Sequence, residues 1–354
     1  PVIDRQTGTI WLLMTWNRGD DKESQINAGA AKDTRRVFVT SSTDDGLTWA
    51  KPKEITSDVK KPEWKWYATG PGGGIQLQRG AHAGRLLVAC DHSDAAGSYR
   101  SHVILSDDAG TTWQLGGIVP GTQLNECQVA ELSDGRVVIN MRNYDRTVKA
   151  RRVSSSSDAG ATWSTPAFDV TLVEPICEAS IERVRWSSGS STGLVAFLNP
   201  ASESSRVNLT LRLSLDETAT WAQSYLLHAG PSAYSDMAVT SSDKVAALYE
   251  CGTSDAYEEI RSAQVTLSES AVTSTSTVSS SSSLSDLSIA SDGLQVYFRP
   301  DQGVNSSAVA DGDAVNSWES SGGETSLSVA ATTTARPVWI KNAFQRADGA
   351  WSSA

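Results

Sequence analysis

The sequence has little positive charge and no basic cluster. Its 354 residues include 30 Lys and Arg against 41 Asp and Glu, which gives a net charge of -11. Nucleic-acid phosphates are bound by clustered Lys and Arg, so this composition argues against a nucleic-acid partner. No apolar stretch reaches the roughly 18 residues that a membrane-spanning helix needs, and no membrane span is expected.

Cysteine and histidine are also scarce. The four cysteines, Cys90, Cys127, Cys177 and Cys251, form no Cys-x-x-Cys pair, and the four histidines are scattered. Structural zinc sites use closely spaced Cys and His ligands, so we expect none. Buried thiols and one or two disulfides fit the cysteine spacing equally well.

What the sequence does contain is a repeat of the form Ser-x-Asp-x-Gly-x-Thr-Trp. Three near copies begin at Ser42, Ser106 and Ser156, and a degraded copy begins at Ser214. The pattern predicts a turn between strands in which the Asp accepts turn N–H groups, the Gly adopts positive φ, and the Trp packs back on the sheet. The aspartates expected in this structural role are Asp44, Asp108, Asp158 and Asp216.

The pattern of the whole chain indicates an all-β fold. No helical periodicity of useful length occurs, and turn signals recur. The repeat serines lie 50 to 64 residues apart, a spacing that suits the four-stranded blade of a β-propeller. We expect a propeller over residues 1–268, a Ser/Thr-rich linker over 269–288, and over 289–354 the start of a second β domain, which resembles the opening strands of a concanavalin-like domain.

The repeat is the Asp box, and with it the chain resembles the exo-α-sialidases (neuraminidases). The box alone marks a fold, because propeller glucanases and non-enzymatic receptors also contain it. It is not a calcium loop, since the further acidic ligands and the closing Glu are missing. The resemblance covers about three quarters of the chain and implies a six-bladed propeller whose first blade is partly missing, since the chain begins at Pro1 in a strand-like stretch.

Segments between the boxes carry the more specific resemblance. "NECQVAELSDGRVVINMRN" contains Glu126 and Arg142, "NPASESSRVNLTLRL" contains Arg206, "AYSDMAV" contains Tyr234, and "AALYECG" contains Glu250. The resemblance implies that Tyr234 is the nucleophile and Glu126 its partner. It also implies that Arg142 and Arg206 bind the substrate carboxylate and that Glu250 supports the arginine triad.

Two of these assignments have rivals in the sequence. Glu131 is an alternative to Glu126, and Arg212 is an alternative to Arg206. Ideal hairpin pairing across the "SDGR" turn would also place Glu126 and Arg142 on different faces of the sheet. A bulge or an irregular strand end must therefore intervene if both residues line one pocket.

Other residues near the predicted pocket fit more than one role. Trp64, Trp66 and Tyr67 precede the glycine-rich stretch "TGPGGGIQLQ", and they fit a sugar platform and a core equally well. Asp91 and His92 follow a strand, where we favour a turn role over contact with substrate.

The chemistry implied by the resemblance explains the choice of residues. Sialic acid has a carboxylate on its anomeric carbon, so a neutral tyrosine approaches it without the repulsion that a carboxylate nucleophile would meet. Tyrosine has an ordinary pKa of about 10 and needs a base such as Glu126 to accept its proton. Arginine binds a carboxylate bidentately and stays charged.

We therefore expect a retaining glycoside hydrolase that releases terminal sialic acid from sialylated glycoconjugates without a metal or organic cofactor. The resemblance also implies a secreted or cell-surface location. It places a third triad arginine and an acid/base aspartate upstream of Pro1, so this stretch by itself is expected to be inactive. The alternatives are a non-catalytic Asp-box propeller that binds glycans or protein partners, and a glucanase that uses two carboxylates.

The Ser/Thr-rich stretch makes a prediction about domain organisation. Limited proteolysis should cut within residues 269–286 and leave the preceding part intact, because this stretch has too few apolar residues to form a core. Mass spectrometry of the fragments would locate the cut. Resistance of the tail to cleavage, because it packs as a further blade, would contradict the predicted boundary.

Overall fold

The computed structural model describes residues 1–267, 317–319 and 326–328. The chain divides into two compact units, residues 1–17 with 23–288 and residues 18–22 with 289–354. In the second unit, β20 (Ser317–Glu319) pairs antiparallel with β21 (Ser326–Ser328). The predicted linker and most of the predicted C-terminal domain lie outside the described residues.

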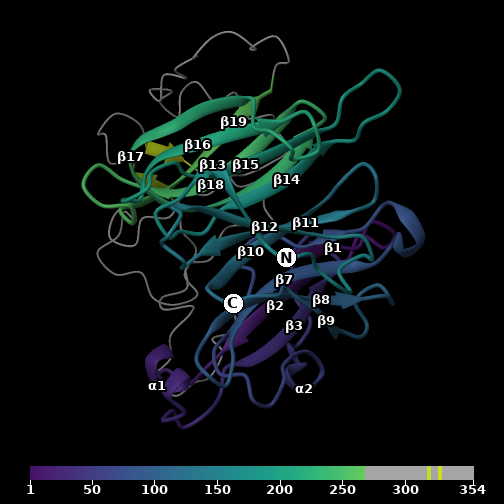
Figure 1. The fold of residues 1–354 in the computed structure, drawn as a ribbon, viewed down its shortest axis with the longest axis vertical. Coiled ribbons are helices and arrows are strands. Elements are labelled where there is room, and N and C mark those ends of the chain that lie inside the picture. Colours follow the sequence, from purple (N-terminus) through teal and green to yellow (C-terminus); the bar gives the residue numbers. More distant parts are fainter. Residues whose placement is uncertain (268–316, 320–325, 329–354) are drawn as a thin grey trace. The chain divides into compact units, whose positions relative to one another are not determined.

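The first unit consists of four antiparallel sheets that follow one another in chain order (Figure 1). The first contains β1 (Val2–Ile3), β2 (Ile10–Trp16), β3 (Arg36–Ser42) and β4 (Lys53–Glu54), and the second contains β5 (Tyr67–Thr69), β6 (Ile75–Gln76), β7 (Leu86–Ser93), β8 (Tyr99–Ser106) and β9 (Gln114–Ile118). The third contains β10 (Leu124–Glu131), β11 (Val137–Asn143), β12 (Ala150–Ser156) and β13 (Ala167–Val173), and the fourth contains β14 (Ser180–Arg185), β15 (Leu194–Pro200), β16 (Val207–Ser214), β17 (Gln223–Ser241), β18 (Lys244–Cys251) and β19 (Glu259–Thr266).

Helical structure is limited to three short pieces among the described residues. These are α1 (Glu23–Ala28), α2 (Thr56–Val59) and the 3₁₀ turn η1 (Gly80–His82). The predicted all-β class is confirmed, and the sheets form a propeller-like arrangement of four blades. The structure does not confirm the predicted number of six blades. No helix in the described part of the chain is long and apolar enough to cross a membrane.

The Asp boxes form the predicted turns. In the second box, Asp108 Oδ1 accepts the Thr112 N–H at 2.8 Å and the Ser106 hydroxyl at 2.8 Å, while its Oδ2 accepts the Thr112 hydroxyl at 2.7 Å. The turn glycines have positive φ, as predicted: 84° at Gly46, 91° at Gly110 and 85° at Gly160. In the degraded box, Thr218 takes the glycine position with a φ of 70°, and Asp216 still accepts the N–H and hydroxyl of Thr220.

The box tryptophans show different degrees of burial. Trp113 and Trp163 are buried, as predicted, whereas Trp49 in the first box is 43% exposed and its Nε1 donates to the Gly46 carbonyl within its own turn. Packing back on the sheet is therefore the wrong expectation for Trp49. Its ring covers the glycine of its box instead.

Part of the core lies between neighbouring sheets. Leu87 of β7 and Val103 of β8 pack in one cluster with Val129 of β10 and Ile139 of β11, so the second and third sheets share apolar side chains.

All four cysteines are buried free thiols: Cys90, Cys127, Cys177 and Cys251. Their spacing in the sequence fits buried thiols and disulfides equally well, and the structure shows buried thiols.

The Asp-box turns also contact the preceding sheet, and this contact gives a prediction. A Cβ at Gly110 would lie 2.1 Å from Cε2 of Trp11 on β2, whereas a Cβ at Gly121 would meet nothing within 4 Å. Both glycines have positive φ, so alanine at either position is strained. Gly110→Ala should lower the free energy of unfolding by about 1–3 kcal/mol more than Gly121→Ala, because it also overpacks the contact with Trp11.

Urea unfolding of the two alanine variants beside the unchanged protein would measure this difference. Equal losses at the two glycines would contradict close packing of the box turn against β2.

Candidate active site

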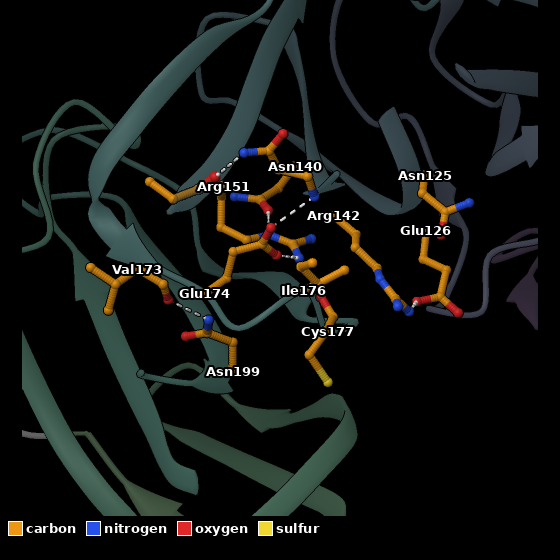
Figure 2. A network of polar contacts seen from close by, with 12 residues as sticks. Asn125, Glu126, Asn140, Arg142, Arg151, Val173, Glu174, Ile176, Cys177 and Asn199 are labelled. Carbon is orange, nitrogen blue, oxygen red and sulfur yellow. Dashed lines mark hydrogen bonds and ion pairs between the residues drawn. The ribbon is translucent and has the colours of Figure 1, made fainter. Parts of the chain in front are cut away.

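The centre of the site is an ion pair that spans a strand irregularity between β10 and β11. Leu124 pairs with Asn143 and Cys127 pairs with Met141, so the register shifts between these two pairs, as the sequence required. Because of this shift, Glu126 reaches Arg142, whose Nη1 donates to Glu126 Oε2 at 2.6 Å (Figure 2). The two side chains are 16% and 12% exposed, so the pair is largely shielded from water.

Tyr234 of β17 joins this pair from a distant part of the sequence. Its hydroxyl donates to Glu126 Oε1 and accepts from Arg142 Nη1 at 3.0 Å. The three side chains therefore form a closed triangle of polar contacts. The sequence predicted all three residues, and the structure brings them together.

Arg206 contacts the same group from the start of β16. Its guanidinium carbon lies 5.6 Å from the centre of the Tyr234 ring. Arg206 Nη2 donates to the Ile176 carbonyl at 3.2 Å, and Nη1 donates to the Tyr257 hydroxyl. Two guanidinium groups thus flank the tyrosine.

Two glutamate side chains hold the backbone at Tyr234. The register of β17 against β18 shifts between Ser232 and Ser235. In this irregular stretch the Tyr234 N–H donates to Glu250 Oε2 at 3.0 Å, and the Ser235 N–H donates to Glu178 Oε2 at 2.9 Å. Glu250 therefore supports the tyrosine backbone, and its predicted support of an arginine triad remains a prediction.

Comparisons with known proteins bear on this arrangement. The model of the BNR repeat-like domain family matches residues 1–247. A sialidase of Micromonospora viridifaciens is 35% identical over 262 residues, which cover 72% of this chain and 40% of that protein. Sialidase-3 of Mus musculus is 30% identical over 312 residues, which cover 73% of each chain.

This chain belongs to the sialidase family. Among solved structures, the Hadza microbial sialidase Hz136 matches with a TM-score of 0.64 and 30% identity over 75% of this chain and 51% of that chain. A Trypanosoma rangeli sialidase in complex with 2,3-difluorosialic acid has the same fold, with a TM-score of 0.52 and 19% identity over 72% of this chain and 40% of that chain. The chain spans less than half the length of the Micromonospora viridifaciens and Bacteroides fragilis sialidases, 40% and 46%.

The rival residues have other roles in this sialidase-family chain. Glu131 accepts the backbone N–H groups of Gln78 and Arg79 at 2.7 and 2.8 Å. Arg212 donates to Asn199 Oδ1 at 2.9 Å. These partners keep both rivals engaged elsewhere, whereas Glu126 and Arg206 contact Tyr234.

A buried ion pair behind the site was not predicted from the sequence. Arg151 is completely buried and donates through Nη1 to Glu174 Oε2 at 2.7 Å and to the Cys177 carbonyl at 2.6 Å (Figure 2). Glu174 Oε1 accepts the N–H of Asn143, the residue after Arg142, at 2.8 Å. The pair therefore fixes the strand end that carries Arg142. No motif distinguishes this Arg and Glu from solvated strand residues.

The aromatic residues before the glycine-rich stretch are mostly core residues. Trp64 and Tyr67 are buried, and Trp64 stacks on His92 with ring centres 3.4 Å apart. Asp91 and His92 lie within the buried strand β7, so a turn role is wrong for both. Asp91 Oδ1 accepts from the side chain of Asn125 at 2.8 Å, which places it behind Glu126.

Burial and the ion pair shift the pKa values of the central groups. Burial raises the pKa of Tyr234 well above its ordinary value, and the adjacent Glu126 carboxylate raises it further. Burial lowers the pKa of Arg142, but the combined effect of Glu126, Tyr144 and Tyr234 outweighs it and the net shift is upward. The resting site therefore holds a neutral phenol beside a permanently charged guanidinium.

Glu178 gives this site a pH-dependent stability. Burial raises its pKa from 4.5 to about 8. Between these values the unfolded chain has lost a proton that the folded protein keeps, so the free energy of unfolding falls as the pH rises. Glu178→Gln should reduce this fall by up to about 1.4 kcal/mol per pH unit.

Thermal or urea unfolding between pH 5 and pH 8 would measure the change in slope. Glu203→Gln, at a side chain that is 62% exposed, is the control for loss of one carboxylate. A slope that is the same in Glu178→Gln as in the unchanged protein would show that Glu178 is ionised in the folded state.

Proposed function

We propose that this chain carries the nucleophile of a retaining exo-α-sialidase, and that Tyr234 attacks the anomeric carbon of sialic acid. The observation that carries the proposal is the contact triangle in which the Tyr234 hydroxyl donates to Glu126 while Arg142 contacts both. The Sialidase-3 of Mus musculus, of which this chain covers 73%, supports the substrate class.

A tyrosine suits this attack because it is neutral at rest. Its raised pKa keeps the proton on Tyr234 until the substrate reacts. The hydroxyl already donates to Glu126, so the proton has an acceptor in place as the phenol oxygen forms its new bond. The negative charge that develops then resides on atoms in contact with Arg142.

The two arginines would bind the substrate carboxylate. Arg142 contacts the hydroxyl of Tyr234 and Arg206 contacts its ring, and the buried Nε of Arg142 has no hydrogen-bond partner within the described part of the chain. A carboxylate on the carbon that Tyr234 attacks would lie between these guanidinium groups. Charge-assisted hydrogen bonds of this kind bind and orient a carboxylate.

The reaction then has two displacement steps. In the first, the Tyr234 oxygen bonds to the anomeric carbon, its proton passes to Glu126, and the leaving group departs with the electron pair of the broken C–O bond and takes up a proton. In the second, water attacks the same carbon, the Tyr234 oxygen leaves and recovers its proton from Glu126, and the water loses a proton. Two inversions give net retention.

The proposal is tested by a substrate whose leaving group needs no proton donor. With 2,3-difluorosialic acid, fluoride leaves without protonation, and the slow second step traps the sugar on the nucleophile. Peptide mass spectrometry should find the fluorosialyl group on Tyr234. Tyr234→Phe should abolish labelling, because the attacking oxygen is absent, and should lower hydrolysis of sialosyl fluoride by several orders of magnitude.

Tyr225→Phe is the matched control, since Tyr225 lies on the same strand, is buried, and its hydroxyl donates to Gln223 Oε1 at 3.3 Å rather than to a residue of the site. It should label as the unchanged protein does. A label on another residue, or first release of the inverted anomer, would disprove the nucleophile assignment. Binding of sialosides without any labelling would favour the non-catalytic propeller instead.

A further inference from the structure

A pair of tyrosines next to the arginine site has no part in the proposed reaction. Tyr144 follows Arg142 by two residues, and the guanidinium carbon of Arg142 lies 5.2 Å from the centre of the Tyr144 ring. The Tyr99 ring lies beyond it, with ring centres 5.3 Å apart and planes inclined by 52°. Both side chains are partly exposed. The two rings extend the site outward from Arg142.

Polar contacts fix the outer ring of this pair. The Tyr99 hydroxyl donates to the Glu23 carboxylate of α1 and accepts from Asn27 Nδ2 at 3.0 Å. Asn27 is itself fixed by two hydrogen bonds. Its backbone carbonyl accepts one from Lys65 Nζ at 2.7 Å, and its side-chain Oδ1 accepts one from the Ser93 hydroxyl. Tyr99 is therefore a preorganised aromatic residue with a carboxylate and an amide at its edge.

This combination of groups suits a neutral sugar. The C–H face of a pyranose has positive partial charge and packs against the negative face of an aromatic ring, while its hydroxyl groups need polar partners at the edge. The Glu23 carboxylate disfavours an anionic residue such as a second sialic acid. A neutral hexose meets both conditions.

The connectivity of a sialoside places such a hexose near this pair. The carboxylate and the glycosidic oxygen of sialic acid are bonded to the same carbon, so the sugar joined through that oxygen lies next to the arginines that hold the carboxylate. We propose that Tyr144 and Tyr99 bind the neutral hexose to which the sialic acid is attached. The inference rests on the proposed function, since it takes Arg142 as a carboxylate ligand.

Saturation-transfer NMR with 3′-sialyllactose and with free sialic acid tests the proposal, and it needs binding alone rather than turnover. In the unchanged protein, the galactose ring protons should receive saturation together with the sialic acid protons. Tyr99→Leu should remove saturation from galactose and lower the affinity for sialyllactose about three- to tenfold. The affinity for free sialic acid should stay the same.

Tyr99→Phe is the matched control, because it keeps the ring and should keep galactose saturation. Tyr144→Leu is a second test, at the inner ring, and it should also remove galactose saturation. Unchanged galactose saturation in both leucine variants would overturn the proposal, as would an equal loss of affinity for free sialic acid. If the unchanged protein binds sialic acid but no galactose protons of 3′-sialyllactose are saturated, the hexose proposal fails and the proposed function stands. If the unchanged protein binds neither 3′-sialyllactose nor sialic acid, the proposed function fails as well.

Discussion

The arrangement of the site depends on a charged contact that must form in a place with little water. Glu126 and Arg142 are each more than four-fifths shielded, and removing two such charges from water costs several kcal/mol unless their geometry is fixed. The surroundings supply that geometry. The fully buried Arg151–Glu174 pair binds the backbone after Arg142, and Asp91 with Asn125 lies behind Glu126. The ion pair in turn keeps a base and a cation within hydrogen-bond distance of the Tyr234 hydroxyl.

Both polypeptide segments that present these groups depart from regular strand pairing. A regular ladder alternates side chains between two faces, so neighbouring positions cannot all point into one pocket. The register shifts at Leu124/Cys127 and at Ser232/Ser235 overcome this restriction. At the second shift, the side-chain oxygens of Glu250 and Glu178 replace strand carbonyls as acceptors for two backbone N–H groups. Irregular pairing at a functional site is thus compensated by one side chain from the neighbouring strand β18 and one from the connection between β13 and β14.

The sequence predicts those parts of the molecule that are encoded locally. The Asp boxes, the positive φ of their glycines and the need for a bulge near Glu126 all follow from short patterns. The choice of Glu126 over Glu131 rests on family resemblance and on strand alternation, which points two residues five positions apart to opposite faces, and the contacts of the two residues agree with it. Arg151, Glu174 and Glu178 could not be predicted, because a charged residue in a strand or in a connection between strands is expected to be solvated unless its burial is known. The exposure of Trp49 and the number of blades depend on how sheets pack against one another, which short patterns do not encode.

The Asp box has a consequence for how such a chain reaches its fold. Each box closes these hydrogen bonds within seven residues, as from the Ser106 hydroxyl to Thr112, which precedes the tryptophan. Contacts of such short range carry a small loop-closure entropy, so we expect box hairpins to form on the microsecond scale of isolated hairpins, before distant strands meet. The triangle at Tyr234 is the opposite case, because it joins positions 108 residues apart. We therefore expect the active site to assemble late, from hairpins already formed, with a folding rate set by long-range closure rather than by the repeat.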